Sequence, residues 1–227
     1  MFGYVRHALV NPLVRLWLAT SEQSWRRLPR PVDSSTVHAP GADADRLLLM
    51  GSGIAVGYGV MSHDLALAGN LARALSARTG RGVSIDVAVG PDITPTTARR
   101  LLPDLDLDRF DAVVLSIGGL EGLTLMPAEM WRLQLTELLD QLRASATPSL
   151  KIFLVETGVP LLSGLPPLSR SLVSSQVARL NRESQQLCAV RGDATFVAFD
   201  PAQGDLNSLA GRSTYVDWAR LIAPRKP

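Results

Sequence analysis

The chain has 227 residues, of which 46% are hydrophobic and 19% are charged, a composition typical of a globular protein with a substantial core. Its formal net charge of +2 and its scattered basic residues give no support to nucleic-acid binding. The single cysteine, Cys188, excludes an intramolecular disulfide, and the three histidines lie too far apart in sequence for a usual metal-ligand spacing. We therefore predict a protein with neither a cofactor nor a metal, in which Cys188 packs within a helix.

The first 30 residues are predicted to form a separate amphipathic helix. Residues 8–20 are apolar, but Arg15 interrupts them, and they fall short of the about 20 residues that a membrane-spanning helix needs. A secretory signal has a clean apolar core followed by a cleavage site of small residues, and neither feature is evident here. We therefore expect a cytoplasmic protein. Asn11 followed by Pro12 is typical of a helix start, and the helix is expected to end near Leu28.

Two roles are open for residues 11–28. Leu13, Leu16 and Trp17 form an apolar stripe, which is expected to pack on the domain or on a second copy in a homo-oligomer. Alternatively, the tryptophans, including Trp25, and the neighbouring arginines favour a helix that lies in a membrane interface and makes peripheral contact with lipid.

The domain itself is predicted to span residues 46–222, after a linker at 31–45 that is rich in Pro, Ser, Gly and Asp and before a short tail at 223–227. Within the domain, short apolar segments alternate with helical patterns. Such alternation predicts a doubly wound α/β layer with a five-stranded parallel sheet and right-handed crossovers. The predicted strands are 46–51, 83–89, 111–117, 150–156 and 195–199, and the predicted helices are 64–78, 95–102, 127–145, 169–190 and 213–222.

Glycines and polar residues gather in the loops after four of these strands, and such loops meet at one edge of a parallel sheet, where ligands bind. Glycines around Ser52 could let a nucleotide pyrophosphate approach the backbone amides. Their spacing, however, is not the GxGxxG fingerprint of dinucleotide-binding proteins, and no acidic residue follows about twenty positions later to bind a ribose. Ser52 could instead act as a nucleophile, with His63 as its base. His63 is the single histidine of the domain, and we predict it in the first turn of a helix capped by Ser62.

The run Leu-Met-Gly-Ser-Gly-Ile-Ala-Val-Gly-Tyr-Gly-Val at residues 49–60 resembles the first sequence block of the SGNH (GDSL-type) hydrolases. Residues 89–97 resemble the second block, residues 113–121 the third, and Tyr215-Val-Asp-Trp-Ala219 the helix after the last block. The resemblance covers nearly the whole domain. It implies a flavodoxin-like three-layer α/β/α fold and ester or acyl hydrolysis. The family's usual site has a serine nucleophile, an oxyanion hole that includes a glycine and an asparagine, and a late Asp-x-x-His.

Several catalytic positions implied by this resemblance carry unsuitable residues. Ser52 falls where the family has aspartate, and Gly53 falls on the nucleophile. Asp92 takes the place of the oxyanion glycine, where its carboxylate would repel a developing oxyanion. Leu120 replaces the asparagine, and leucine donates no hydrogen bond, while Glu121 replaces the aspartate that follows.

The late Asp-x-x-His would fall on residues 205–212, which contain no histidine. We therefore predict a pseudo-hydrolase that keeps the fold, has lost ester hydrolysis, and binds, scaffolds or regulates an unknown protein partner or a small ligand. Its former cleft would offer acidic and hydroxyl groups to a cationic or polyhydroxylated ligand, unless these side chains are solvated loop caps. The side chains concerned are Ser52, Asp92, Thr94 and Glu121, with Glu156 or Asp205 as further candidates. One rival hypothesis is an active esterase with a rearranged site that uses Ser52 as nucleophile and either His63 or a carboxylate as base. A second rival is a nucleotide-binding domain.

Overall fold

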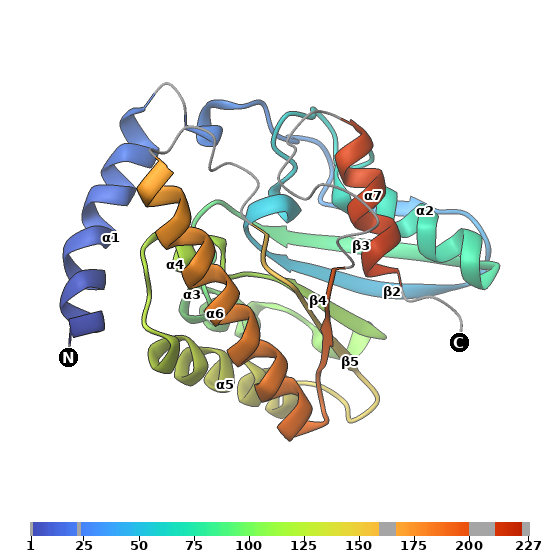
Figure 1. The fold of residues 1–227 in the computed structure, drawn as a ribbon. Coiled ribbons are helices and arrows are strands. Elements are labelled where there is room, and N and C mark those ends of the chain that lie inside the picture. Colours follow the sequence, from blue (N-terminus) through green and yellow to red (C-terminus); the bar gives the residue numbers. More distant parts are fainter. Residues whose placement is uncertain (1, 22–23, 159–166, 200–211, 224–227) are drawn as a thin grey trace.

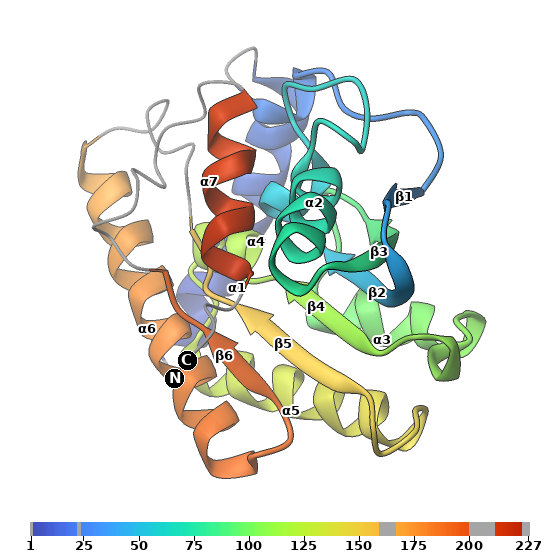
Figure 2. The ribbon, with the colours of Figure 1, turned by 90° about the vertical axis from the view of Figure 1, so that its right-hand side faces the viewer.

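The computed structural model describes residues 2–21, 24–158, 167–199 and 212–223, which form a six-stranded sheet with helices on both faces (Figure 1, Figure 2). The sheet order is β1-β3-β2-β4-β5-β6, with β1 antiparallel to β3 and the other strands parallel. The strands are β1 (Thr36–Ala39), β2 (Ala42–Gly51), β3 (Arg81–Val89), β4 (Ala112–Ser116), β5 (Lys151–Val155) and β6 (Thr195–Val197).

The side chains of β2 alternate between the two faces of the sheet, as the pleat of a strand requires. Leu47 and Leu49 join the core beneath α2 (Leu67–Thr79) and α7 (Arg212–Ile222). Leu48 and Met50 join the core on the other face, which is covered by α3 (Pro95–Leu101), α5 (Ala128–Ala144) and α6 (Pro167–Arg191). Because the parallel strands have the flavodoxin-like order and both faces are covered, the predicted three-layer α/β/α fold is confirmed.

The described helices of the domain begin and end within about three residues of the predicted bounds, close to the uncertainty expected at any helix end. Cys188 lies in α6 and is 3% exposed, which confirms its predicted packing. The sequence patterns did not predict α4 (Gly119–Leu123), because five residues are too few to show a helical period. The short 3₁₀ helices are Trp25–Arg27, Gly53–Val56, Leu102–Asp104 and Leu107–Arg109.

The sheet has six strands rather than the predicted five, because part of the segment predicted as a linker forms β1. Val37 and Ala39 are buried while His38 is exposed, so the strand alternates, but four residues among Pro, Ser and Gly give too short a pattern to predict. β2 also begins at Ala42 instead of Arg46. The sheet therefore includes residues from 36 onward.

The N-terminal helix α1 runs from Phe2 to Thr20 instead of from Asn11 to Leu28. Pro12 lies inside it, where proline removes one backbone hydrogen bond, and its exposed position leaves the freed carbonyl to water. The turns before Pro12 are held by the domain, since Nδ1 of His7 lies 2.7 Å from the carbonyl oxygen of Thr124. Among the described residues, no helix is long and apolar enough to cross a membrane.

Candidate functional site

The carboxyl ends of β2, β3 and β4 meet at one edge of the sheet. Gly51 pairs with Val89 on one side and Ser116 on the other, and the amide of Ser52 donates a 2.7 Å hydrogen bond to the carbonyl of Ser116. At Gly51 the backbone has φ of +138°, and a Cβ there would overlap the carbonyl group of Ser116. Glycine therefore allows the strand to end tightly against β4, which fixes the start of the loop that follows.

A small cavity of about 20 Å³ lies at this edge, room for about one water molecule. The loops after β2, β4 and β5 line it together with α7, so three of the four predicted loops converge there. The lining residues are Ser52, Gly53, Ile54, Ser116, Ile117, Gly119, Glu156, Thr157, Gly158 and Trp218.

Ser52 and Gly53 occupy the position expected for a nucleophile. Ser52 is only 3% exposed, and its hydroxyl makes no hydrogen bond with any described residue. Gly53 has φ of +64°, and a Cβ added there would meet nothing within 4 Å. A side chain at position 53 would therefore have room, but glycine supplies none.

His63 does not lie in the turn predicted for it. It is 8% exposed and precedes α2, which begins at Leu67, and its Nδ1 lies 2.8 Å from Oδ1 of Asp33. The backbone amide of His63 also donates to Asp33, at 3.0 Å to Oδ1. Burial raises the pKa of Asp33, but these hydrogen bonds outweigh it and hold the pKa below its ordinary value. The structure thus pairs His63 with Asp33, and it does not place His63 among the residues that line the cavity at Ser52.

Asp92 and Thr94 lie outside the residues that line the cavity. The carboxylate of Asp92 accepts a 2.6 Å hydrogen bond from Nη2 of Arg26, and Nη1 of Arg15 lies 3.5 Å away. Thr94 caps α3 and accepts a hydrogen bond from the amide of Thr97 at 3.2 Å. Thr94 is therefore engaged as a loop cap, and Asp92 connects its loop to the N-terminal segment.

Leu120 and Glu121 lie in α4 and are buried, at 6% and 1% exposure. Neither carboxylate oxygen of Glu121 has a hydrogen-bond partner among the described residues. Desolvation raises the pKa of Glu121 to about 7, although the nearby backbone amides of Glu121 and Gly118, which do not reach hydrogen-bond geometry, and the charge of Arg15 act in the opposite direction. Glu121 is thus a buried carboxyl group that water and ligands cannot reach in this conformation.

Trp218 is a cavity residue that the sequence interpretation did not assign to the site. Its ring is 1% exposed and meets the ring of Phe199 edge-on, with centroids 4.4 Å apart. Glu156 is held beside it, because its Oε2 accepts a 2.7 Å hydrogen bond from the amide of Phe199. The Tyr-x-x-Trp-Ala pattern of α7 could have indicated that Trp218 is buried, since it places Trp218 one turn after Tyr215, on the same side of the helix.

The sequence profile of the GDSL-like lipase/acylhydrolase family matches residues 49–220. The chain belongs to this family. The match covers the domain and confirms the resemblance to the SGNH (GDSL-type) hydrolases, while α1 and β1 precede the matched residues. No curated protein matches the sequence.

Solved structures of GDSL-like proteins have the same fold at low sequence identity. The lipase/acylhydrolase from Enterococcus faecalis is 16% identical, with a TM-score of 0.61 over 79% of this chain and 93% of that one. A lipolytic protein of the G-D-S-L family from Desulfitobacterium hafniense is 13% identical, with a TM-score of 0.56 over 78% and 98%. The esterase EstA from Pseudoalteromonas is 17% identical, with a TM-score of 0.52 over 78% and 92%. These likenesses establish the shared fold.

In this GDSL-like domain, the residues predicted for the site do not assemble. Ser52 and Gly53 line the cavity, Asp92 binds arginines outside it, and Glu121 is buried in α4. The predicted late block at residues 205–212 lies outside the described residues, apart from the first residue of α7. The sequence itself has no histidine after His63.

Proposed function

We propose that this member of the GDSL-like lipase/acylhydrolase family does not hydrolyse esters by a serine mechanism and acts instead as a binding or regulatory protein. The observation that carries the proposal is Gly53. Its position matches the nucleophile of the family by sequence and lies in the cavity at the sheet edge, yet it has no side-chain oxygen. Acyl transfer to the protein needs such a nucleophile.

Within the described residues, the domain also lacks a suitably placed general base and one of the usual hydrogen-bond donors of the oxyanion hole. His63, the only histidine of residues 46–222, is not among the residues that line the cavity at Ser52. Its Nδ1 lies 2.8 Å from Oδ1 of Asp33, a pairing that can orient a catalytic histidine but acts only beside a nucleophile. Leu120 offers an apolar side chain where the family has an asparagine. Loss of the catalytic serine and histidine in a serine hydrolase leaves only the part of the rate that comes from binding and oxyanion donors. Here the asparagine donor is replaced as well, so we expect no measurable turnover.

The rival function is an active esterase that uses Ser52. It is favoured by membership of a hydrolase family and by the position of Ser52 in the same cavity as the carboxylate of Glu156. For this reaction, a proton acceptor must approach the Ser52 hydroxyl and the cavity must open beyond its volume of about 20 Å³.

A nucleotide-binding role would require the same opening at Gly51–Gly53, and thermal stabilisation by nucleotides tests it.

A fluorophosphonate probe and a panel of short-chain aryl esters and acetylated sugars separate the two functions. The probe forms a covalent bond only with an activated serine, so we expect neither labelling nor hydrolysis by the full-length chain. Ser52→Ala is the informative variant. Ser116→Ala is its matched control, because Ser116 lines the same cavity and its hydroxyl donates to the carbonyl of Ser52 at 3.3 Å. Hydrolysis that disappears with Ser52→Ala and persists with Ser116→Ala would overturn the proposal.

A further inference from the structure

The helix α1 is fixed on the domain by one of its faces. Val10 and Val14 pack against a small core cluster that includes Leu123 of α4 and Val173 of α6. Leu18, near the end of the helix, is 1% exposed. The contact of His7 with the carbonyl of Thr124 adds a polar anchor. Because these contacts hold one face of α1, its opposite face is presented outward in a fixed orientation (Figure 1).

The outer face of α1 is apolar. It consists of Val5, Leu9, Leu13 and Leu16, whose spacing of four, four and three residues places them on one side of a helix. Their exposed fractions are 55%, 65%, 66% and 61%. A contiguous exposed apolar surface of this kind marks an interaction site more often than single exposed leucines do.

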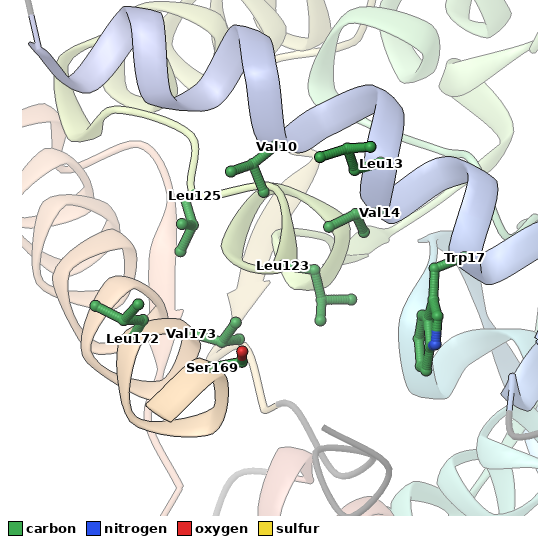
Figure 3. A pocket seen from close by; sticks show the side chains of 9 residues that line it. All are labelled: Val10, Leu13, Val14, Trp17, Leu123, Leu125, Ser169, Leu172 and Val173. Atoms are coloured by element: carbon green, nitrogen blue, oxygen red, sulfur yellow. The ribbon is translucent and has the colours of Figure 1, made fainter. Parts of the chain in front are cut away.

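A groove of about 310 Å³ opens beside this outer face, between α1, α4 and the start of α6 (Figure 3). Its volume is about twice that of an engineered apolar cavity that stays dry and binds benzene. Leu13 and Leu172 line the groove and are also exposed, at 66% and 53%, so the groove is continuous with the outer face. Only one lining side chain is polar, Ser169; the others are Val10, Leu13, Val14, Trp17, Leu123, Leu125, Leu172 and Val173.

The charges around this surface are mostly positive, although Arg15 and Arg26 share the carboxylate of Asp92. The first 30 residues contain five arginines and one carboxylate, Glu22. The helical repeat of about 100° per residue places Arg6 and Arg15 on opposite sides of the outer face. On α6, Arg170 is exposed in the first turn, and no acidic residue occurs in that helix before Glu183. An apolar stripe flanked by arginines is the pattern of a helix that lies in a lipid interface, where long basic side chains reach the headgroups.

We propose that the outer face of α1 and the adjoining groove dock on a bilayer containing anionic lipid. The outer face enters the interface, the arginines meet lipid phosphates, and the groove takes one acyl chain. A second copy is a poorer occupant, because a two-fold contact through this face would place the arginines that flank it in both copies at the same interface. The outer face of α1 precedes the family-matched residues 49–220, whereas α4 and α6 on the other side of the groove lie within them. The proposal holds whether or not the chain hydrolyses esters.

Vesicle flotation with the full-length chain tests the docking. We expect binding to phosphatidylcholine vesicles that contain phosphatidylglycerol, weaker binding to pure phosphatidylcholine, and a decrease in binding as salt is added. Leu9→Asp with Leu16→Asp should lower the partition coefficient at least about tenfold, since both side chains would leave the interface. The matched control is Leu133→Asp with Val190→Asp, whose leucine and valine are 61% and 78% exposed on α5 and α6. The control should bind like the unmodified chain.

Trp17 reports on the groove, which its ring lines. In a Trp25→Phe background, lipids brominated on the acyl chain should quench Trp17 emission, while Trp131 and Trp218, each 1% exposed, stay unquenched. Quenching lost with Trp17→Phe supports the acyl-chain site, and vesicle binding without quenching would overturn it. Equal vesicle binding by the two aspartate variants, or no binding by the unmodified chain, would overturn the docking. A third outcome would assign the surface to a second copy instead. In that case the unmodified chain does not bind vesicles, and light scattering shows a dimer that Leu9→Asp with Leu16→Asp breaks and the control variant does not.

Discussion

Glu121 should make the protein less stable as the pH rises from about 4.5 to about 7. Its carboxyl group is 1% exposed, has no hydrogen-bond partner among the described residues, and has its pKa raised from 4.5 to about 7. Between these two pH values the folded chain keeps the proton that the unfolded chain releases. Because the unfolded state then binds fewer protons, the free energy of unfolding falls as the pH increases.

The size of the effect follows from the shift of the pKa. A shift of one unit corresponds to about 1.4 kcal/mol, so a rise from 4.5 to about 7 corresponds to about 3 kcal/mol. The stabilisation is fully present below pH 4.5 and lost by about pH 7, with little further change above that. This is a large part of the 5–15 kcal/mol that typically stabilises a domain.

Glu121→Gln removes the titration and keeps the shape of the side chain. Urea unfolding at pH 5 and pH 8 measures the free energy of unfolding for the unmodified chain and the variant. Between pH 5 and pH 8 we expect the free energy of unfolding to fall by about 2–3 kcal/mol less in Glu121→Gln than in the unmodified chain, because all other titrating groups are shared. Glu129→Gln is the matched control, since Glu129 is exposed at the start of α5. Identical pH dependence in Glu121→Gln and the unmodified chain would refute the reasoning.

Three further predictions concern other parts of the structure. Gly51→Ala should lower the free energy of unfolding by about 3 kcal/mol or more, because its Cβ would overlap the neighbouring strand; Gly119→Ala, with nothing within 4 Å, should change it far less in the same urea titration. Tyr215→Phe should cost about 1 kcal/mol in thermal unfolding, since the buried hydroxyl donates a 2.7 Å hydrogen bond to the carbonyl of Tyr58. Asp92→Asn should cost less than about 1 kcal/mol in chemical unfolding, as its arginine pairs are partly exposed; a larger loss would show that they hold the N-terminal segment more strongly than surface pairs do.

The sequence predicted the regular part of the domain because that part depends on local patterns. The apolar run before Gly51 had to be buried on both faces, and the helical stripes on α2 and α5 had to cover a sheet. Val37 and Ala39 were missed because a four-residue strand is recognisable only through its pairing with β3, more than 40 residues later. Long-range pairing leaves no periodic signal in so short a segment.

The candidate site was predicted in part for the same reason. The loop at Ser52 was located because a strand, a glycine turn and a helix follow one another in sequence. The partners of Asp92 and His63 were not predictable, because Arg26 comes from the predicted N-terminal helix and Asp33 from the predicted linker, and neither segment was expected to contact these loops. The burial of Glu121 could not be predicted either, because the five residues of α4 are too few to show which face of the helix is buried.

Strand β1 also determines which fragments of this chain can be expected to stay in solution. It covers the outer side of β3, and it is itself short, followed by Pro40 and exposes Thr36 and His38. These are the features that natural proteins use to stop one sheet from joining another. A fragment cut to the family-matched residues 49–220 would lose this cover and expose the backbone donors and acceptors of β3. Such a fragment is therefore expected to aggregate, so the boundary of the folding unit lies upstream of the boundary of the family.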